Sequence, residues 1–345
     1  MNAHMMAQMG ENLRWTSFPN NAKDLLGKIE HFYFSCKANN MMWKPEILID
    51  SINQFVYNVV DARDIKRTKL SASQQLQLAD IIVNYLSFSG DETDRQALFN
   101  SIFYSINFQK GDVPLRILGL VTSLSVAFRK SEILQCIAVW ITAASLENPA
   151  VLCIAYELSR DLITDEFPDK YQNLPQRSYL FSAVFLIAVG KAYKSIPPPQ
   201  RLIDQVTVWI ENCPRVCFIP PQSAIFEIFR WCAHSEEDQS RLHLALMSAI
   251  DRAGKGAQLQ VIPHIMTLIQ ELRVKREHVV SANNNGGLAY AQVERGVDML
   301  FQLIQMLLAS ECLDRNEIHP IFESSEEALL PRTELYDMLK SIYFR

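Results

Sequence analysis

Hydrophobic residues recur every three or four positions along most of the chain, which is the spacing of amphipathic α-helices. The clearest case is the stretch from Leu70 to Phe103. Ser71 followed three residues later by Gln74 predicts a capping box at the start of a helix. The apolar stripe expected on this first helix comprises Leu76, Ala79, Val83 and Leu86.

A short polar turn, FSGDE at residues 88–92, follows this helix. Gly90 suits a left-handed C-cap, and either Asp91 or Thr93 can cap a second helix. The buried face expected on the second helix comprises Leu98, Phe99, Ile102 and Phe103. Two apolar stripes this close together are expected to pack as an antiparallel pair. Such a pair leaves apolar surface uncovered, and stacking further pairs on it is one way to bury that surface.

The same periodicity predicts about fourteen helices and no convincing strand along the chain. The charged segment 61–69, DARDIKRTK, is expected to be a linker. Prolines at 197–199 and 220–221 stand where they suit the first turn of a helix, and Gly254 ends another. The predicted fold class is therefore all-α, an α-solenoid of stacked antiparallel helix pairs that resembles HEAT or armadillo repeats.

The predicted organisation is a flexible, Met-rich lead-in at residues 1–21 and a helical-repeat scaffold at residues 22–345. A looser stretch near 165–177 marks the place where a sub-boundary would fall. The most apolar segments, 133–144 and 183–189, are shorter than the roughly twenty residues that cross a bilayer. They are expected to be core helices, so no membrane partner is expected.

Composition narrows the classes of function. Of 345 residues, 49% are hydrophobic and 21% are charged, which is typical of a packed helical protein. The 33 basic and 38 acidic residues give a formal charge of -5, so no basic excess favours a phosphate backbone. Direct nucleic acid binding is therefore not expected, and basic clusters such as 63–69 are interpreted as solvated surface. With only 11 glycines, few positions remain for phosphate-binding loops.

Seven cysteines, most of them within apolar helical runs, are interpreted as buried side chains in a reducing compartment. One set of residues offers four zinc ligands in a C-x3-C and C-x-H pattern. These ligands are Cys213, Cys217, Cys232 and His234. The same spacing is also one turn of ordinary helical core, and that interpretation is favoured. No catalytic motif is present, so neither catalytic residues nor a cofactor is expected.

The stretch from Leu70 to Phe103 resembles the corresponding segment of the Integrator complex subunit 15 family. The residues that carry the resemblance are Leu70, Gln75, Leu76, Gln77, Leu78, Ile81, Asn84, Tyr85, Arg95, Gln96, Phe99, Ser101 and Phe103. Further similarities are Pro214-Arg215, the Arg230-Trp231-Cys232 triplet and the SRLHLAL segment around His243. Together they extend over roughly residues 22–342.

The resemblance implies a noncatalytic, all-helical subunit of the nuclear Integrator complex. The implied role is to link the peripheral module of subunits ten, thirteen and fourteen to the core, in small nuclear RNA 3' end processing and attenuation of RNA polymerase II transcription. The implied partners are these other Integrator subunits. Asn84 and Arg95 are candidate partner contacts because the apolar stripe does not require them, and Arg230 is a third because it could reach a partner surface.

Two other functions fit the same residues. One is a helical-repeat interaction scaffold outside Integrator, which localisation would separate from a nuclear subunit. The other is a zinc-dependent helical enzyme that uses the cysteine and histidine set. The sequence alone does not distinguish a helix face that binds a partner from one that packs into the core, because both have the same periodicity.

Overall fold

The computed structural model describes residues 17–60, 67–88, 90–104, 112–144, 151, 154–155, 169–193, 198–211, 222–235, 239–281 and 287–344. These residues are predominantly helical, which confirms the predicted all-α class. Contacts divide the chain into two compact units, Met1–Ala188 and Val189–Arg345, and the division falls within α11 (Tyr179–Ala192). The sub-boundary expected near 165–177 stays a prediction, and the lead-in to residue 16 lies outside the described residues.

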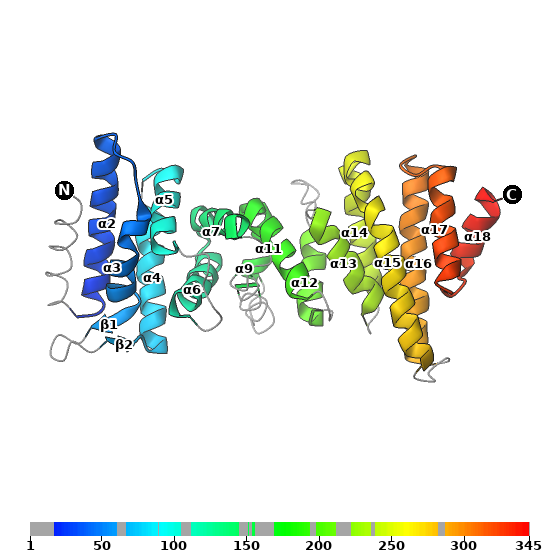
Figure 1. The fold of residues 1–345 in the computed structure, drawn as a ribbon, viewed down its shortest axis with the longest axis horizontal. Coiled ribbons are helices and arrows are strands. Elements are labelled where there is room, and N and C mark those ends of the chain that lie inside the picture. The colour runs from blue at the N-terminus through cyan, green and yellow to red at the C-terminus, as the bar shows by residue number, and fades with distance from the viewer. Residues whose placement is uncertain are drawn as a thin grey trace. The chain divides into compact units, whose positions relative to one another are not determined.

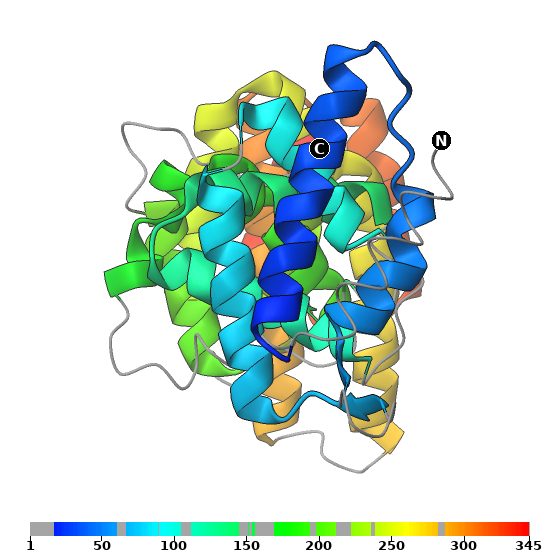
Figure 2. The same ribbon diagram turned by 90° about the vertical axis from the view of Figure 1, so that its left-hand side faces the viewer.

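The first unit is built from helices that pack on near neighbours in the chain. Its described helices are α2 (Asn20–Ala38), the 3-10 helix η1 (Pro45–Leu48), α3 (Ile49–Phe55), α4 (Ala72–Phe88), α5 (Glu92–Ile102), α6 (Val113–Ala127), α7 (Ser131–Ala144), α9 (Asp169–Gln172), α10 (Leu174–Arg177) and the first part of α11. Helix α4 contacts α2, α5, α6 and α7. Figures 1 and 2 show α2 and α4 side by side.

The capping box predicted at the start of α4 is confirmed. The backbone N–H of Ser71 donates to Gln74 Oε1 at 2.9 Å, and the backbone N–H of Gln74 donates to Ser71 Oγ at 3.3 Å. The predicted stripe is wrong at Leu76, which is 49% exposed. The buried face of α4 is centred between Ile82 and Leu86, and Leu76 lies about a quarter-turn from that centre.

The turn before α5 requires a glycine. Gly90 has φ +32°, and a Cβ atom there would lie 2.6 Å from Asp94 Oδ2. Asp91, rather than Thr93, is the N-cap: its carboxylate accepts from the backbone N–H of Asp94 at 2.9 Å. The four residues predicted for the buried face of α5, namely Leu98, Phe99, Ile102 and Phe103, are all buried.

The charged segment at 61–69 differs from a simple linker at its described end. Strand β1 (Asn58–Val60) pairs antiparallel with β2 (Arg67–Lys69), with Asn58 opposite Lys69. The hydrogen bonds that pair two three-residue strands join backbone groups. The charged side chains of this segment do not alternate with apolar ones, so the sequence does not predict a strand here. Arg63 and Lys66 lie outside the described residues.

The second unit continues the serial packing. Its helices are the end of α11, α12 (Gln200–Glu211), α13 (Gln222–His234), α14 (Ser240–Ala253), α15 (Lys255–Ser281), α16 (Leu288–Ala309), α17 (Arg315–Glu327) and α18 (Glu334–Tyr343). Helix α13 contacts α14, α15 and α16, helix α15 contacts α17, and α16 contacts α18. Gly254 follows α14 with φ +76°, as the sequence predicts.

Helices α13, α15 and α16 approach closely at Gly296. A Cβ atom at this position of α16 would lie 2.7 Å from Leu272 Cδ2 and 3.1 Å from the carbonyl oxygen of Ala233. The missing side chain therefore lets three helices meet at one level of the second unit. Among the described residues, no helix combines the length and the apolarity that a membrane span requires.

Candidate functional site

The structure describes two of the four predicted zinc ligands. Cys213 and Cys217 lie outside the described residues, whereas Cys232 and His234 lie on α13. Cys232 is 4% exposed, and burial raises the pKa of its thiol well above the ordinary value. No group of three or more histidine, cysteine, aspartate or glutamate residues suited to a metal ion occurs in the described part of the chain. The zinc hypothesis thus has no support from its described members.

The described cysteines and the most buried of the described histidines behave as core residues. Cys36, Cys136, Cys232 and Cys312 are free and buried, and burial raises the pKa of Cys136 to about 12. His243 on α14 packs edge-on against Phe229, and burial lowers its pKa to about 4. At neutral pH the Cys136 thiol is therefore protonated and the imidazole is neutral. Neither is prepared for nucleophilic or general-base chemistry.

Arg230 lies inside the second unit. Its Nη1 is 2.7 Å from Glu227 Oε2 on the same helix, and its Nε is 2.7 Å from Glu271 Oε2 on α15. The side chains of Arg230 and Glu227 are 13% and 9% exposed. His234 Nε2 lies 3.4 Å from the same oxygen of Glu271. The structure therefore places this candidate partner contact in a polar cluster that ties α13 to α15.

The charge of Glu271 is stabilised by this cluster. Burial alone would raise the pKa of Glu271, but His234 and Arg230 together bring it below its ordinary value. The carboxylate therefore stays ionised at neutral pH and holds the guanidinium of Arg230 in place. Sequence reasoning did not find Glu271, because it is 41 residues from Arg230 and nothing local to it predicts the contact.

Arg95 joins α5 to the end of α4. Its Nε donates to the carbonyl oxygen of Leu86 at 2.9 Å, and its Nη2 donates to that of Gly90 at 3.5 Å. These carbonyls belong to the last turn of α4 and the loop after it, where backbone acceptors lack helical donors. Gln96 similarly reaches the Cys136 carbonyl on α7 at 3.4 Å. Both side chains make contacts between helices.

Asp94 is a buried carboxylate that joins α5 to α2. The hydroxyl of Tyr33 donates to Asp94 Oδ1 at 2.8 Å, and Lys37 Nζ is 2.5 Å from the same oxygen. Burial alone would raise the pKa of Asp94, but Lys37, Tyr33 and the Asp91 N–H bring it below its ordinary value. Burial and this carboxylate raise the pKa of Tyr33 to about 12. Asp94 was not a candidate from sequence, because Tyr33 is 61 residues away.

Asn84 is exposed and borders an open groove between α2 and α4, which we call the α2–α4 groove. The groove has a volume of about 340 Å³ and is lined by Lys23, Leu26, Asp80, Ile81, Asn84, Tyr85 and Phe88. Phe88, at the end of α4, is 87% exposed. Of the three candidate partner contacts, Asn84 is therefore the one on an open apolar surface.

The second unit has a groove of its own between α12 and α14, which we call the α12–α14 groove. It has a volume of about 510 Å³ and is lined by Glu211, Arg241, Leu244, Ala245, Ser248 and Arg252. Arg241 forms a two-pronged ion pair with Glu211, at 2.8 Å and 2.5 Å. Leu244 is 64% exposed. Each unit thus offers an open groove with an exposed apolar side chain.

The fold and these contacts define a helical protein whose described polar clusters join helices and whose open grooves place an exposed apolar side chain beside polar ones. The chain belongs to the Integrator complex subunit 15 family, whose family model matches residues 7–230. This match confirms the resemblance carried by the stretch from Leu70 to Phe103.

Individual relatives agree with the family match. The chain is similar to Integrator complex subunit 15 of Drosophila melanogaster, with 22% identity over 341 residues that cover 88% of each chain. It is 28% identical over 213 residues to the Homo sapiens protein of that name, covering 57% of this chain and 45% of the human one. The Danio rerio protein is 23% identical over 322 residues, covering 77% of this chain and 66% of the relative.

Proposed function

We propose that this chain is a noncatalytic scaffold subunit of the nuclear Integrator complex. It bridges the peripheral module of subunits ten, thirteen and fourteen to the core, in small nuclear RNA 3' end processing and attenuation of RNA polymerase II transcription. The observation that carries this proposal is the family match over residues 7–230. The fruit fly relative, named as a subunit of Integrator, extends the similarity over 88% of each chain.

The packing of the second unit supports an α-solenoid of the HEAT or armadillo kind as the scaffold. Described helices of the second unit contact elements one, two or three positions away in the chain, such as α13 with α16 and α15 with α17. In repeat proteins each element packs only on its near neighbours, and the resulting extended faces are used for binding. A scaffold of residues 22–345 built this way presents separate surfaces to separate proteins.

Bridging needs at least two binding surfaces, and we assign one to each unit. The α2–α4 groove, with Asn84 and Phe88, serves the first unit, and the α12–α14 groove, with Leu244, serves the second. Exposed apolar side chains of this kind mark interaction surfaces when they adjoin a groove with a polar rim.

Affinity purification from nuclei at moderate salt tests the assignment to Integrator. We expect the tagged chain to recover Integrator subunits from both the peripheral module and the core. Recovery of no Integrator subunit would refute the proposal, and cytoplasmic localisation with unrelated clients would favour a scaffold outside the complex.

Removing the apolar anchor of the α2–α4 groove is expected to weaken binding without affecting folding. For Phe88→Ala combined with Asn84→Ala, we expect recovery of the bound subunit to fall about tenfold, because a few anchoring side chains carry most interface energy. The melting temperature should stay within about 1 °C, since both side chains are exposed. Phe128→Ala is the matched control, because Phe128 is 58% exposed and lies outside the groove. Equal recovery by all three proteins would exclude the groove as a binding surface.

A further inference from the structure

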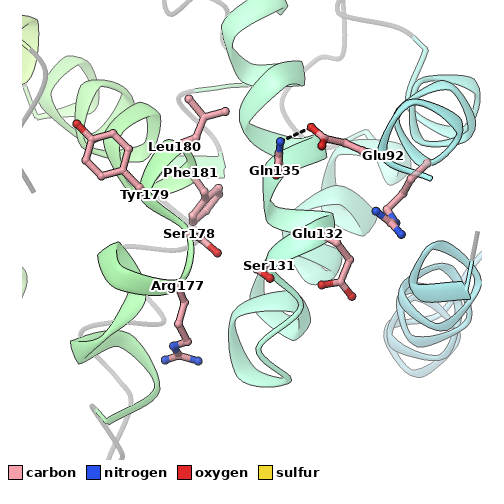
Figure 3. Close-up of a pocket in the computed structure, with 10 residues that line it drawn as sticks. Glu92, Ser131, Glu132, Gln135, Arg177, Ser178, Tyr179, Leu180 and Phe181 are labelled. Carbon is pink, nitrogen blue, oxygen red and sulfur yellow. Dashed lines mark hydrogen bonds between the residues drawn. The ribbon is translucent and has the colours of Figure 1, made fainter. Parts of the chain in front are cut away.

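A second pocket of the first unit lies where the starts of three helices meet. We call it the α7–α11 pocket. It has a volume of about 330 Å³ and is lined by residues from the first turns of α5 and α7 and from the α10–α11 junction, Arg177 to Phe181. Figure 3 shows the junction facing α7 across the pocket.

The hydroxyl of Ser178 is a buried polar group of the junction. Ser178 is 9% exposed, and its Oγ is buried without a hydrogen-bond partner. Figure 3 shows the hydroxyl directed from the junction toward the start of α7. Leaving a buried hydroxyl unpaired costs folding free energy, so such a group in a native protein calls for an explanation. A ligand that accepts or shares this hydrogen bond when bound is one such explanation.

The start of α11 adds backbone donors at the same place. Ser178 immediately precedes α11, a helix of 14 residues, and its unpaired Oγ does not cap it. Tyr179, Leu180 and Phe181 form the first turn and line the pocket. The first backbone N–H groups of a helix have no acceptor within the helix and carry partial positive charge. Together with the Ser178 hydroxyl, the backbone N–H groups of Leu180 and Phe181 form a site suited to an anionic acceptor.

Charged side chains limit which anion fits. On the junction side, burial and the nearby Arg129 both lower the pKa of Arg177, so positive charge lies close to the junction. On the opposite side lie Glu132, Glu92 and Arg95. Glu92 is held by a hydrogen bond from Gln135 (Figure 3), and the guanidinium of Arg95 donates to the carbonyl oxygens of Leu86 and Gly90. The two carboxylates outnumber the single guanidinium on that side, so the net negative charge would repel a doubly charged phosphate more strongly than a singly charged carboxylate.

We propose that the α7–α11 pocket binds the carboxylate of an aspartate or glutamate side chain from a protein partner. The carboxylate accepts hydrogen bonds from Ser178 Oγ and from the backbone N–H groups of Leu180 and Phe181, beside the positive charge of Arg177. Tyr179 and Leu180, each 45% exposed, cover the apolar neighbours of that acidic residue. This inference rests on the proposed scaffold function and specifies the chemistry of one partner contact.

The acidic residue is identified first, by cross-linking. A photo-cross-linking amino acid replaces Leu180 in the full chain, which is then purified with its complex. We expect cross-links to a segment of an Integrator subunit that contains aspartate or glutamate. Cross-links only to segments without an acidic residue, or only to this chain itself, would overturn the inference and leave the scaffold function standing. Recovery of no Integrator subunit would overturn both.

Affinity for a synthetic peptide of the cross-linked sequence then tests the role of Ser178. For Ser178→Ala we expect about tenfold weaker binding, because a hydrogen bond to a carboxylate is lost, together with an unchanged or higher melting temperature. Ser182→Ala is the matched control, since Ser182 also has a buried hydroxyl without a partner but does not line the pocket. It should bind like the unmodified chain. Equal affinity for Ser178→Ala and Ser182→Ala would contradict the proposal.

Discussion

Replacing Arg230 with alanine is expected to lower the free energy of unfolding by about 3 kcal/mol. Arg230 is the cation between Glu227 and Glu271, at 2.7 Å from each. Its loss leaves two carboxylates on neighbouring helices, one of them 9% exposed, with less compensating charge. Removing one member of a buried ion pair is far more damaging than removing an exposed one. Chemical denaturation of the purified chain measures the effect.

Two control variants separate the effect of the shape of the Arg230 guanidinium from the effect of its charge. Arg230→Lys keeps the positive charge, but one ammonium group cannot approach both carboxylates as the two ends of the guanidinium do, so we expect an intermediate loss. Arg273→Ala removes an arginine of α15 whose pair with Glu277 is about half exposed, and we expect a change of at most about 0.5 kcal/mol. If Arg230→Ala is as stable as Arg273→Ala but loses an Integrator subunit, Arg230 is a partner contact rather than an internal one.

Replacing Asp94 with alanine is expected to lower the free energy of unfolding by about 2 kcal/mol. The carboxylate is 6% exposed and accepts from Tyr33 and from the Asp91 N–H of the capping box. Its removal leaves the Tyr33 hydroxyl without this acceptor and removes one of the two hydrogen bonds of the capping box of α5. Asp24→Ala, an exposed carboxylate on α2, is the control and should leave stability nearly unchanged. Equal midpoints for the two variants would contradict this role.

The pH dependence of stability distinguishes the charge of Asp94 from its shape. The pKa of Asp94 is lower in the folded chain than in the unfolded one, so its contribution is present above the unfolded value and is lost as pH falls through the folded value. The pKa of Tyr33 is raised to about 12, so its contribution is present below its unfolded value and is lost as pH rises through 12. Asp94→Asn should flatten the acid limb of the stability profile. An unchanged acid limb would refute the assignment.

The helical fold could be predicted where its signals are local. The Ser71 and Gln74 capping box, the glycine at position 90 and the buried face of α5 depend on residues within one or two turns of one another. The assignment of Leu76 to the buried face was wrong. A spacing of three or four residues marks a broad apolar face, and the helices that pack against it decide which residues at its edges are buried. The β1–β2 pairing was missed because its backbone ladder has no side-chain signature.

Contacts between distant residues could not be predicted from one sequence. Asn84 was found because it is polar at a position the apolar stripe does not require, and it does lie on a groove. Arg95 was found for the same reason, and Arg230 because it could reach a partner surface. Both contact other helices instead, because a helix that stacks on several neighbours can turn its polar positions inward. The unpaired Ser178 hydroxyl has no sequence signal, since only the arrangement of α7, α10 and α11 shows that it lacks a partner.

The central claim is that the chain bridges two parts of Integrator through its two units. A residue-resolved cross-linking map of the purified complex tests this claim most directly. We predict that cross-links from residues 1–188 reach one part, either the peripheral module or the core, and that cross-links from residues 189–345 reach the other. Cross-links from both units to the same subunits, or from one unit alone, would contradict the bridging account.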